Sequence, residues 1–277
     1  MGYFYYLDEG FRGTLQSWRA RKGRWLILAA VQTLLFFSLL AVLLTYQLKI
    51  VQEGQHMLES MSSAFGSQPE QDTLKGAAAI QNSFHALLQQ VLTGILWLFL
   101  LFLLGNGALW LLTHNLLRKG EQSWKVVAQQ WLKYAAVTAT GGVLLLIVFY
   151  VTLKNLFALD TSMDSITRPL IIASIGVLIL YYFSAVAFAL VTESSWKHFF
   201  KDIFHLGIQK IHRALPALII SMAAILLSFL FIYNVLNRGW QVLWLMLASL
   251  IFIIVVVFAR IWWTACLQSL QHEKDHR

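Results

Sequence analysis

Charged residues are scarce in this sequence. Only 12% of its 277 residues are Asp, Glu, Lys or Arg, whereas 58% are hydrophobic. A soluble domain carries about 25% charged residues, because its surface faces water. The low charge therefore argues against an ordinary water-soluble domain, and it predicts that most of the surface faces lipid.

Cysteine and proline are also rare. The one cysteine, Cys266, excludes an internal disulfide and a cysteine-based zinc cluster. The three prolines, Pro69, Pro169 and Pro216, lie outside the long apolar runs. The membrane helices are therefore expected to be unbroken, which disfavours transporter folds built from discontinuous helices.

Six apolar runs are long enough to cross a membrane as helices. A run of about 18 or more apolar residues without charge is typical of a transmembrane helix, which crosses a hydrocarbon core of about 30 Å. The sequence thus predicts an all-α integral membrane protein, with a six-helix membrane domain over residues 25–265. The predicted spans are Trp25–Gln47, Leu87–Leu112, Ala135–Leu153, Leu170–Val191, Ala217–Val235 and Val242–Trp263.

Basic residues are divided unevenly between the two sides that these spans define. Of the 21 lysines and arginines, 16 fall on the side of the two termini. Loops rich in Lys and Arg stay in the cytoplasm. We therefore expect residues 1–24 and the tail 266–277 to be cytoplasmic, in the inner (plasma) membrane of a cell. Topology explains the net charge of +8, so no nucleic-acid partner is expected.

A short phrase recurs three times on the predicted cytoplasmic side. It reads QSWR at residues 16–19, QSWK at 122–125 and SSWK at 194–197, and each copy precedes an odd-numbered span. Tryptophan on one helix face and bases on another are typical of an amphipathic helix at head-group depth. The pattern predicts cytoplasmic interfacial helices that contact membrane lipids, including anionic head groups. The predicted lipid contacts are Trp18, Arg19, Arg21, Trp124, Lys125, Trp131, Trp196, Lys197 and Lys201.

Two interpretations of this phrase stay open. In the first, the chain is a pseudo-repeat of three hairpins, each preceded by an interfacial helix. In the second, the copies arose by convergence, because any cytoplasmic helix that leads into a span tends to be rich in Trp, Lys and Arg. The copies are unevenly spaced, with 106 and then 72 residues between their tryptophans.

The link between the first two spans is too long for a turn. Apolar residues recur at helical spacing on both sides of Pro69. The sequence therefore predicts a helical hairpin over residues 49–86 that extends both spans outward by about 25 Å. Its apolar stripes either join the two arms or dock a partner outside the membrane.

Few residue patterns suggest chemistry. No ionisable side chain lies in the middle of a predicted span, where such groups usually mark ion or proton pathways. Lys154 and Arg260 lie near span ends and are expected to reach the interface. His198, His205 and His212 share a helical face, but a separation of about 10 Å is too long for a common metal. We therefore expect a solvated histidine face, with no cofactor or metal.

Polar side chains within the spans remain as candidates for a site. Such residues more often join helices by hydrogen bonds than bind a substrate. The candidate intramembrane polar cluster is Gln32, Gln89, Gln90, Asn106 and Thr138. Convergence of these side chains on one cavity would indicate a pathway.

The sequence favours a non-enzymatic scaffold or accessory subunit that acts through lipid and protein contacts. Its partner would be another membrane protein or a second copy of the chain. The alternative is a permease or lipid transporter with a pathway between the helical hairpins. An integral lipid enzyme that uses His85 or His114 is a third class, but no nucleophile or paired carboxylate accompanies either histidine.

Labelling of single cysteines tests the predicted topology. In a Cys266→Ala background, Ser67→Cys should react with a membrane-impermeant maleimide on intact cells, because residue 67 is predicted to lie outside. The matched Gln122→Cys variant should react only after the membrane is permeabilised. The opposite labelling pattern would show that the orientation is inverted.

Overall fold

The computed structural model describes residues 5–66, 70–118, 124–157, 163–192, 198–238 and 242–272. The described residues are almost all helical, and no strand occurs among them. Six of the helices in these ranges are long and apolar enough to cross a membrane, so the prediction of an all-α multi-pass membrane protein is confirmed. The elements are α1 (Tyr5–Ala20), α2 (Lys22–Gly66), α3 (Glu70–Leu117), α4 (Trp124–Phe157), α5 (Met163–Leu190), α6 (Phe199–Phe204), the π-helix η1 (His205–Gln209), α7 (Ile211–Asn237) and α8 (Val242–His272).

Two of the prolines lie inside helices. α5 and α7 begin before Pro169 and Pro216, which fall within the first two turns of these helices. Both prolines precede the predicted apolar spans, as expected, but the helices begin before those spans and therefore include them. A proline removes one backbone hydrogen bond. Pro169 is the seventh residue of α5 and Pro216 the sixth of α7, so each lies beyond the first four N–H groups that have no intrahelical acceptor.

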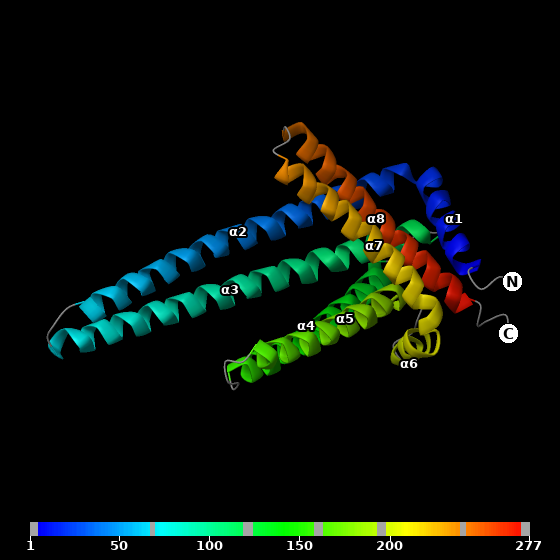
Figure 1. The fold of residues 1–277 in the computed structure, drawn as a ribbon. Helices are drawn as coiled ribbons and strands as arrows, with labels where there is room; N and C mark the ends of the chain where they lie inside the picture. The colour runs from blue at the N-terminus through cyan, green and yellow to red at the C-terminus, as the bar shows by residue number, and fades with distance from the viewer. Residues whose placement is uncertain are drawn as a thin grey trace. The chain divides into compact units, whose positions relative to one another are not determined.

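The chain divides into two compact units, and the smaller one is Thr33–Gly105. This unit is an antiparallel pair formed by most of α2 and α3, the blue-to-teal helices in Figure 1. Glycines allow the two helices to approach closely: a Cβ on Gly94 would lie 2.9 Å from Tyr46 Cγ. A Cβ on Gly105 would overlap the side chain of Leu35. The close packing of α2 against α3 therefore depends on glycine at two positions along the pair, Gly94 and Gly105.

Both helices of this pair are longer than a bilayer requires. α2 has 45 residues and α3 has 48, or about 68 and 72 Å at about 1.5 Å per residue. A hydrocarbon core is about 30 Å thick. The part of the hairpin beyond the predicted spans therefore has to be stable in water.

The apolar stripe of α2 beyond its predicted span has two faces. Ile50, Met57 and Met61 are half-buried, whereas Val51 and Leu58 are 51% and 64% exposed. One row of apolar side chains therefore packs within the hairpin, and a second row remains on its surface. The half-buried row can join the two arms of the hairpin, and the exposed row can dock a partner. Both predicted roles of the apolar stripes therefore stay open.

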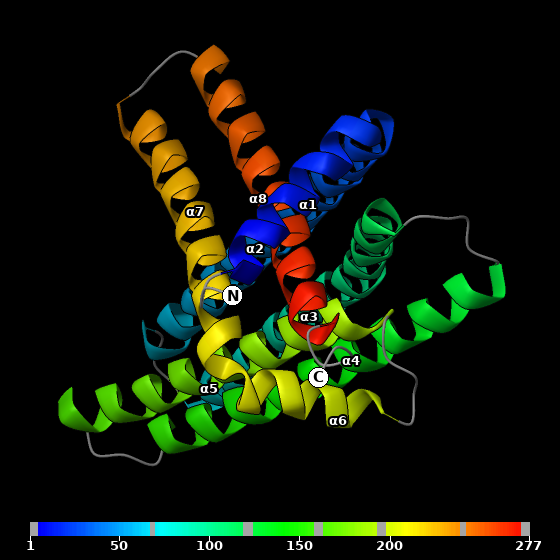
Figure 2. The ribbon, with the colours of Figure 1, turned by 90° about the vertical axis from the view of Figure 1, so that its right-hand side faces the viewer.

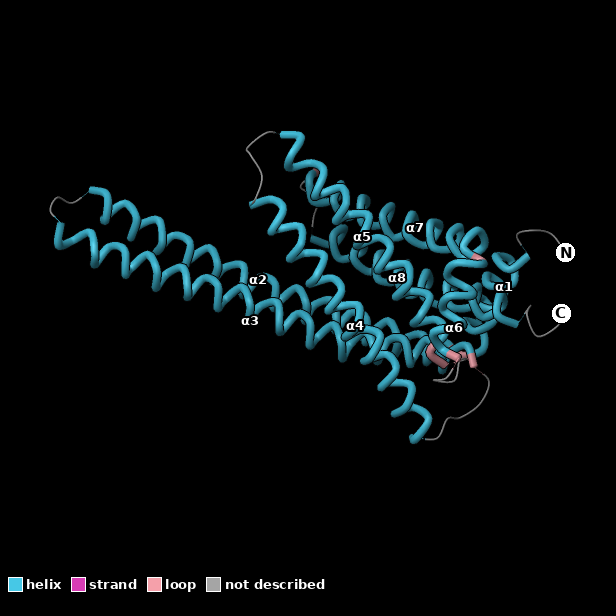
Figure 3. Tube along the Cα trace, turned by 90° about the horizontal axis from the view of Figure 1, so that it is seen from below, coloured by secondary structure: helices cyan, strands magenta, loops and turns pink. Residues whose placement is uncertain are grey.

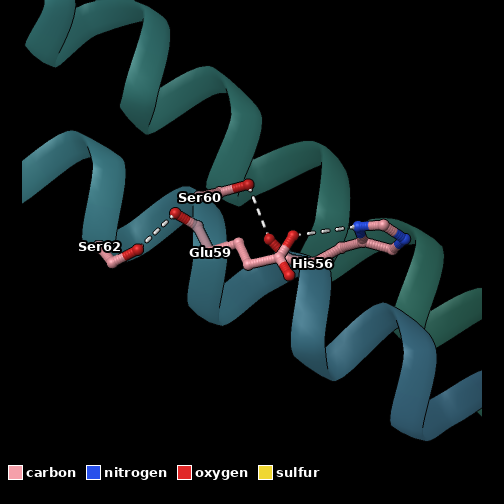
Figure 4. Close-up of polar contacts among 4 residues, drawn as sticks. All are labelled: His56, Glu59, Ser60 and Ser62. Carbon is pink, nitrogen blue, oxygen red and sulfur yellow. Dashed lines mark hydrogen bonds and ion pairs between the residues drawn. The ribbon is translucent and has the colours of Figure 1, made fainter.

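Polar side chains on the same stretch of α2 contact one another locally (Figure 4). His56 Nδ1 lies 3.7 Å from Glu59 Oε2. The hydroxyls of Ser60 and Ser62 donate to the carbonyls of His56 and Glu59, each over 2.8 Å. These contacts stay within one helix, as expected for a polar face exposed to water.

The larger unit comprises Met1–Gln32 and Asn106–Arg277. Within it, α4 pairs with α5 and α7 pairs with α8, each as an antiparallel hairpin, and α1 packs on α8. Figures 2 and 3 show these pairs from two sides. The core of this unit lies at the C-terminal end of α5, where every residue from Ala185 to Val191 is buried. The helices of the larger unit therefore meet at this end of α5.

The close approach at Gly94 predicts different outcomes for two glycines on the hairpin. Gly94→Ala should lower stability by about 1–3 kcal/mol because the methyl group collides with the Tyr46 ring. Gly54→Ala is the matched control, since no atom lies within 4 Å of a Cβ there. It should be neutral or stabilising by up to about 1 kcal/mol through helix propensity. Thermal unfolding in detergent micelles measures both, and equal effects would contradict the packing.

Candidate functional site at the end of helix α5

Basic side chains bind the C-terminal carbonyls of three of the described helices. The last carbonyls of a helix have no intrahelical donor, and an unsatisfied carbonyl in a membrane costs several kcal/mol. At the end of α3, Arg21 Nη1 donates to the carbonyls of Asn115 and Leu116 over 2.8 and 3.0 Å. Arg24 Nη1 reaches the Asn115 carbonyl over 3.1 Å. A positive charge at this position also complements the helix dipole.

The same type of contact recurs at α5 and α8. Lys133 Nζ donates over 3.3 Å to the carbonyl of Val191, which follows α5. Lys210 Nζ donates over 2.6 Å to the carbonyl of Leu270 in the last turn of α8. In each case the base comes from the first helix of a hairpin or from the residue just before it. The carbonyl comes from the second helix or from the residue just after it. The bases therefore close the hairpins at one end.

This geometry alters the interpretation of two predicted surface segments. Arg21 was predicted to contact lipid, but it is half-buried against α3. The second copy of the tryptophan phrase begins the continuous helix α4, and Gln130 and Lys133 are buried at 5% and 9% exposure. The polar face of this segment therefore points into the protein. The sequence suggested the reverse, because a helix at the membrane surface turns its polar face to water. A helix whose outer face contacts lipid instead turns its polar side chains toward the protein interior.

The first copy, in α1, has an exposed apolar face. Gly10, Thr14 and Ser17 are buried, and a Cβ on Gly10 would lie 3.1 Å from Cys266 N in α8. α1 therefore packs on α8 through small residues. Its large apolar side chains remain on the surface: Phe11, Leu15 and Trp18 are 46%, 36% and 45% exposed.

The other predicted lipid contacts have mixed positions. Arg19, Lys125 and Lys201 are exposed, and Trp131 is half-buried, near Gly107 of α3. Trp196 and Lys197 lie outside the described residues, as does the side chain of Trp124. These positions leave the interfacial-helix interpretation a prediction.

The three histidines spaced by seven residues do not share one regular helix. His198 precedes α6, His205 begins the π-helix η1, and His212 lies in α7 beyond a break at Lys210. The extra residue in a π-turn rotates the following side chains, so the common face expected from the spacing is lost. Among the described residues, no group of three His, Cys, Asp or Glu side chains could hold a metal ion.

His114 lies at the centre of the polar contacts around α5. Its Nε2 is 3.1 Å from the Phe188 carbonyl, so Nε2 carries the proton and donates. Its Nδ1 lies 2.7 Å from Thr192 Oγ1 and 3.4 Å from Gln268 Nε2. Nδ1 therefore accepts from these two groups. His114, which is 2% exposed, links α3, α5 and α8 and has no free nitrogen for acid–base chemistry.

Aromatic rings surround His114. The Trp110 ring lies 5.4 Å from the Phe188 ring and 6.3 Å from the His114 ring. Tyr134 of α4 completes this group, 5.9 Å from Phe188, and its hydroxyl donates to the Phe188 carbonyl over 3.4 Å. We call Trp110, His114, Tyr134 and Phe188 the aromatic cluster.

Arg260 of α8 covers the aromatic cluster. Its guanidinium carbon lies 5.6 Å from the centre of the Trp110 ring. Its Nη1 is buried and has no hydrogen-bond partner in the described part of the chain. The side chain as a whole is half-buried, and the expectation that Arg260 reaches the membrane interface stays a prediction.

The five candidate polar residues are distributed over both units. Asn106 and Thr138 are each 6% exposed, and Gln32 has a buried Oε1; all three belong to the larger unit. Gln89 and Gln90 belong to the hairpin unit, where Gln89 is exposed and Gln90 half-buried. Only the first three therefore lie in the unit that contains the aromatic cluster.

Sequence reasoning missed Thr192, Gln268 and the role of His114. One signal was available: Asn106, Trp110 and His114 recur every four residues, so they share one face of α3. No protein-family profile matches the chain, and neither a curated protein nor a solved structure matches it significantly.

Replacement of His114 tests whether it joins the helices. His114→Leu should lower stability by about 2–4 kcal/mol, because it leaves buried partners without a hydrogen bond. His85→Leu is the matched control, since His85 is an exposed histidine on the same helix. Thermal unfolding in micelles measures both, and Thr192→Val should add little to His114→Leu. A neutral His114→Leu would contradict the structural role.

Proposed function

We propose that this protein is a non-enzymatic, multi-pass membrane protein that acts as a scaffold or accessory subunit through lipid and protein contacts. One observation carries the proposal. On the part of the α2–α3 hairpin beyond the predicted spans, Val51, Leu58 and Phe84 are 51%, 64% and 51% exposed. Apolar side chains exposed to water together usually mark an interaction site. The partner is a membrane protein, either a different chain or a second copy.

The proposed location is the inner (plasma) membrane, with both termini cytoplasmic. The uneven distribution of basic residues supports this orientation. The exposed Phe11, Leu15 and Trp18 of α1, beside the exposed Arg12 and Arg19, support contact with anionic lipid at the cytoplasmic surface.

The polar contacts around α5 favour a structural role over catalysis. His114 uses both ring nitrogens, and Lys133 binds a main-chain carbonyl. A catalytic base needs a nitrogen or oxygen within reach of substrate. These side chains instead hold α3, α4, α5 and α8 together, as a rigid scaffold requires.

A lipid transporter or permease is the second candidate. It is favoured by buried polar atoms that have no partner among the described residues, which include Gln32 Oε1, Thr138 Oγ1 and Arg260 Nη1. Polar groups left unpaired in a membrane protein often line a pathway. Their presence on α2, α4 and α8 is the reason to test flux directly.

Site-specific photocrosslinking tests the scaffold proposal. A benzophenone side chain at position 58 should crosslink a membrane protein or a second copy in native membranes, because the apolar stripe docks there. The same side chain at Gln55, which is exposed but polar, should give at least about tenfold less product. No discrete product at position 58 would contradict the protein-contact role.

Flux into sealed vesicles tests the alternative. Reconstituted protein should give no more gradient-driven flux of protons or sodium than protein-free vesicles. Flux that is abolished by Asn106→Leu or Thr138→Val would replace the scaffold proposal with the transporter.

A further inference from the structure

Arg260 is a charged side chain in a predicted membrane-spanning helix, and no acidic side chain among the described residues pairs with it. It is the nineteenth residue of α8, whose candidate span runs from Val242 to Gln271. The side chain is half-buried, and Nη1 is fully enclosed without a hydrogen-bond acceptor in the described ranges. Arginine keeps its charge in proteins. The positive charge therefore needs compensation from outside the described residues.

The Trp110 ring does not supply that compensation in full. A cation over an aromatic face is stabilised by roughly 0.5–2 kcal/mol. Removal of an ion from water costs several kcal/mol even after the protein relaxes. A bound anion would provide the remaining stabilisation of the buried charge, since charge-assisted hydrogen bonds to guanidinium are strong and frequently bidentate.

Two neighbouring helices carry a buried polar side chain one helical turn from the aromatic cluster. Thr138 lies one helical turn from Tyr134 on α4, and Asn106 lies one turn from Trp110 on α3. Both are buried, and Thr138 Oγ1 has no partner among the described residues. A hydroxyl and an amide can each donate a hydrogen bond to a phosphate oxygen, and a guanidinium can bind two such oxygens at once.

The depth of Arg260 identifies the source of the phosphate. It stands three residues before Trp263, the end of the last predicted span, or about 5 Å along the helix. Residues near the end of a transmembrane span lie close to the lipid head groups, which long basic side chains can reach. At that depth the bilayer itself presents phosphodiester groups. Basic pockets between transmembrane helices bind anionic lipids in this way.

We propose that Arg260, with Asn106 and Thr138, binds the phosphodiester of an anionic phospholipid at the edge of the aromatic cluster. This inference deepens the proposed function, because it names the class of lipid that the protein holds. It is tested by binding, whereas the scaffold role is tested by crosslinking and flux. The experiments can therefore distinguish a failure of the lipid site from a failure of the scaffold proposal.

Native mass spectrometry of the full chain in detergent measures the binding. With added phosphatidylglycerol the wild-type protein should retain one lipid at concentrations where phosphatidylcholine is not retained. Arg260→Gln should weaken retention at least about tenfold, and Arg260→Lys should weaken it less, because a single ammonium cannot bind bidentately. Arg238→Gln, which removes an exposed charge from the end of α7, should change retention less than about twofold. Equal retention by Arg260→Gln and wild type would overturn the proposal.

Thermal stability separates this role from a purely structural one. Without lipid, Arg260→Gln should be as stable as wild type or more stable, because an unpaired buried charge has been removed. Phosphatidylglycerol should raise the melting temperature of the wild type and leave that of Arg260→Gln unchanged. A variant that is less stable without lipid and responds normally to it would overturn the lipid site.

Competition distinguishes lipid from free phosphate. Inorganic phosphate and glycerol 3-phosphate at millimolar concentration should not displace bound phosphatidylglycerol, since neither carries acyl chains. Displacement by either compound at a concentration similar to that of the lipid would assign the site to a soluble phosphate and overturn the lipid assignment.

Discussion

The carbonyl groups at the C-terminal ends of membrane helices impose the main constraint on this fold. Each helix leaves its last four carbonyls without an intrahelical donor, and a membrane supplies little water to satisfy them. Bases from the start of each hairpin meet this need at α3, α5 and α8, through Arg21, Lys133 and Lys210. The interaction depends on a positive charge, so it links the distribution of bases along the chain to the packing of its helices. The same residues that favour a cytoplasmic orientation also close the hairpins.

The arrangement around α5 follows from this constraint. With the carbonyls of Phe188 and Val191 as acceptors, donors converge from α3 and α4. Trp263 of α8 adds a bond to the Ala185 carbonyl over 3.1 Å. Buried polar groups of this kind stabilise a fold only when all of them are paired. His114 is paired on both nitrogens, whereas Nη1 of Arg260, whose guanidinium lies over the Trp110 ring, has no partner among the described residues.

In all three hairpins a base binds a carbonyl at the end of the second helix, but the position of that base in the sequence differs. The base lies three residues after the tryptophan of its phrase in the first copy, nine in the second and fourteen in the third. A strict repeat would keep this spacing, whereas selection for capped helix ends would not. The common contact is therefore consistent with convergence as well as with descent from one hairpin, and the pseudo-repeat remains a hypothesis.

Sequence alone determined the number of helices that are long and apolar enough to cross a membrane, because the loss of charge over 18 or more residues is a local property of the sequence. It also indicated that α2 and α3 continue well beyond a membrane, since their apolar residues keep helical spacing. Tertiary structure decided which polar residues matter. Lys133 and Arg21 looked like surface charges until the carbonyls they bind, 58 and about 94 residues away in the chain, came within hydrogen-bond distance. No local pattern encodes such partners, because hydrogen bonding between helices depends on how the helices pack.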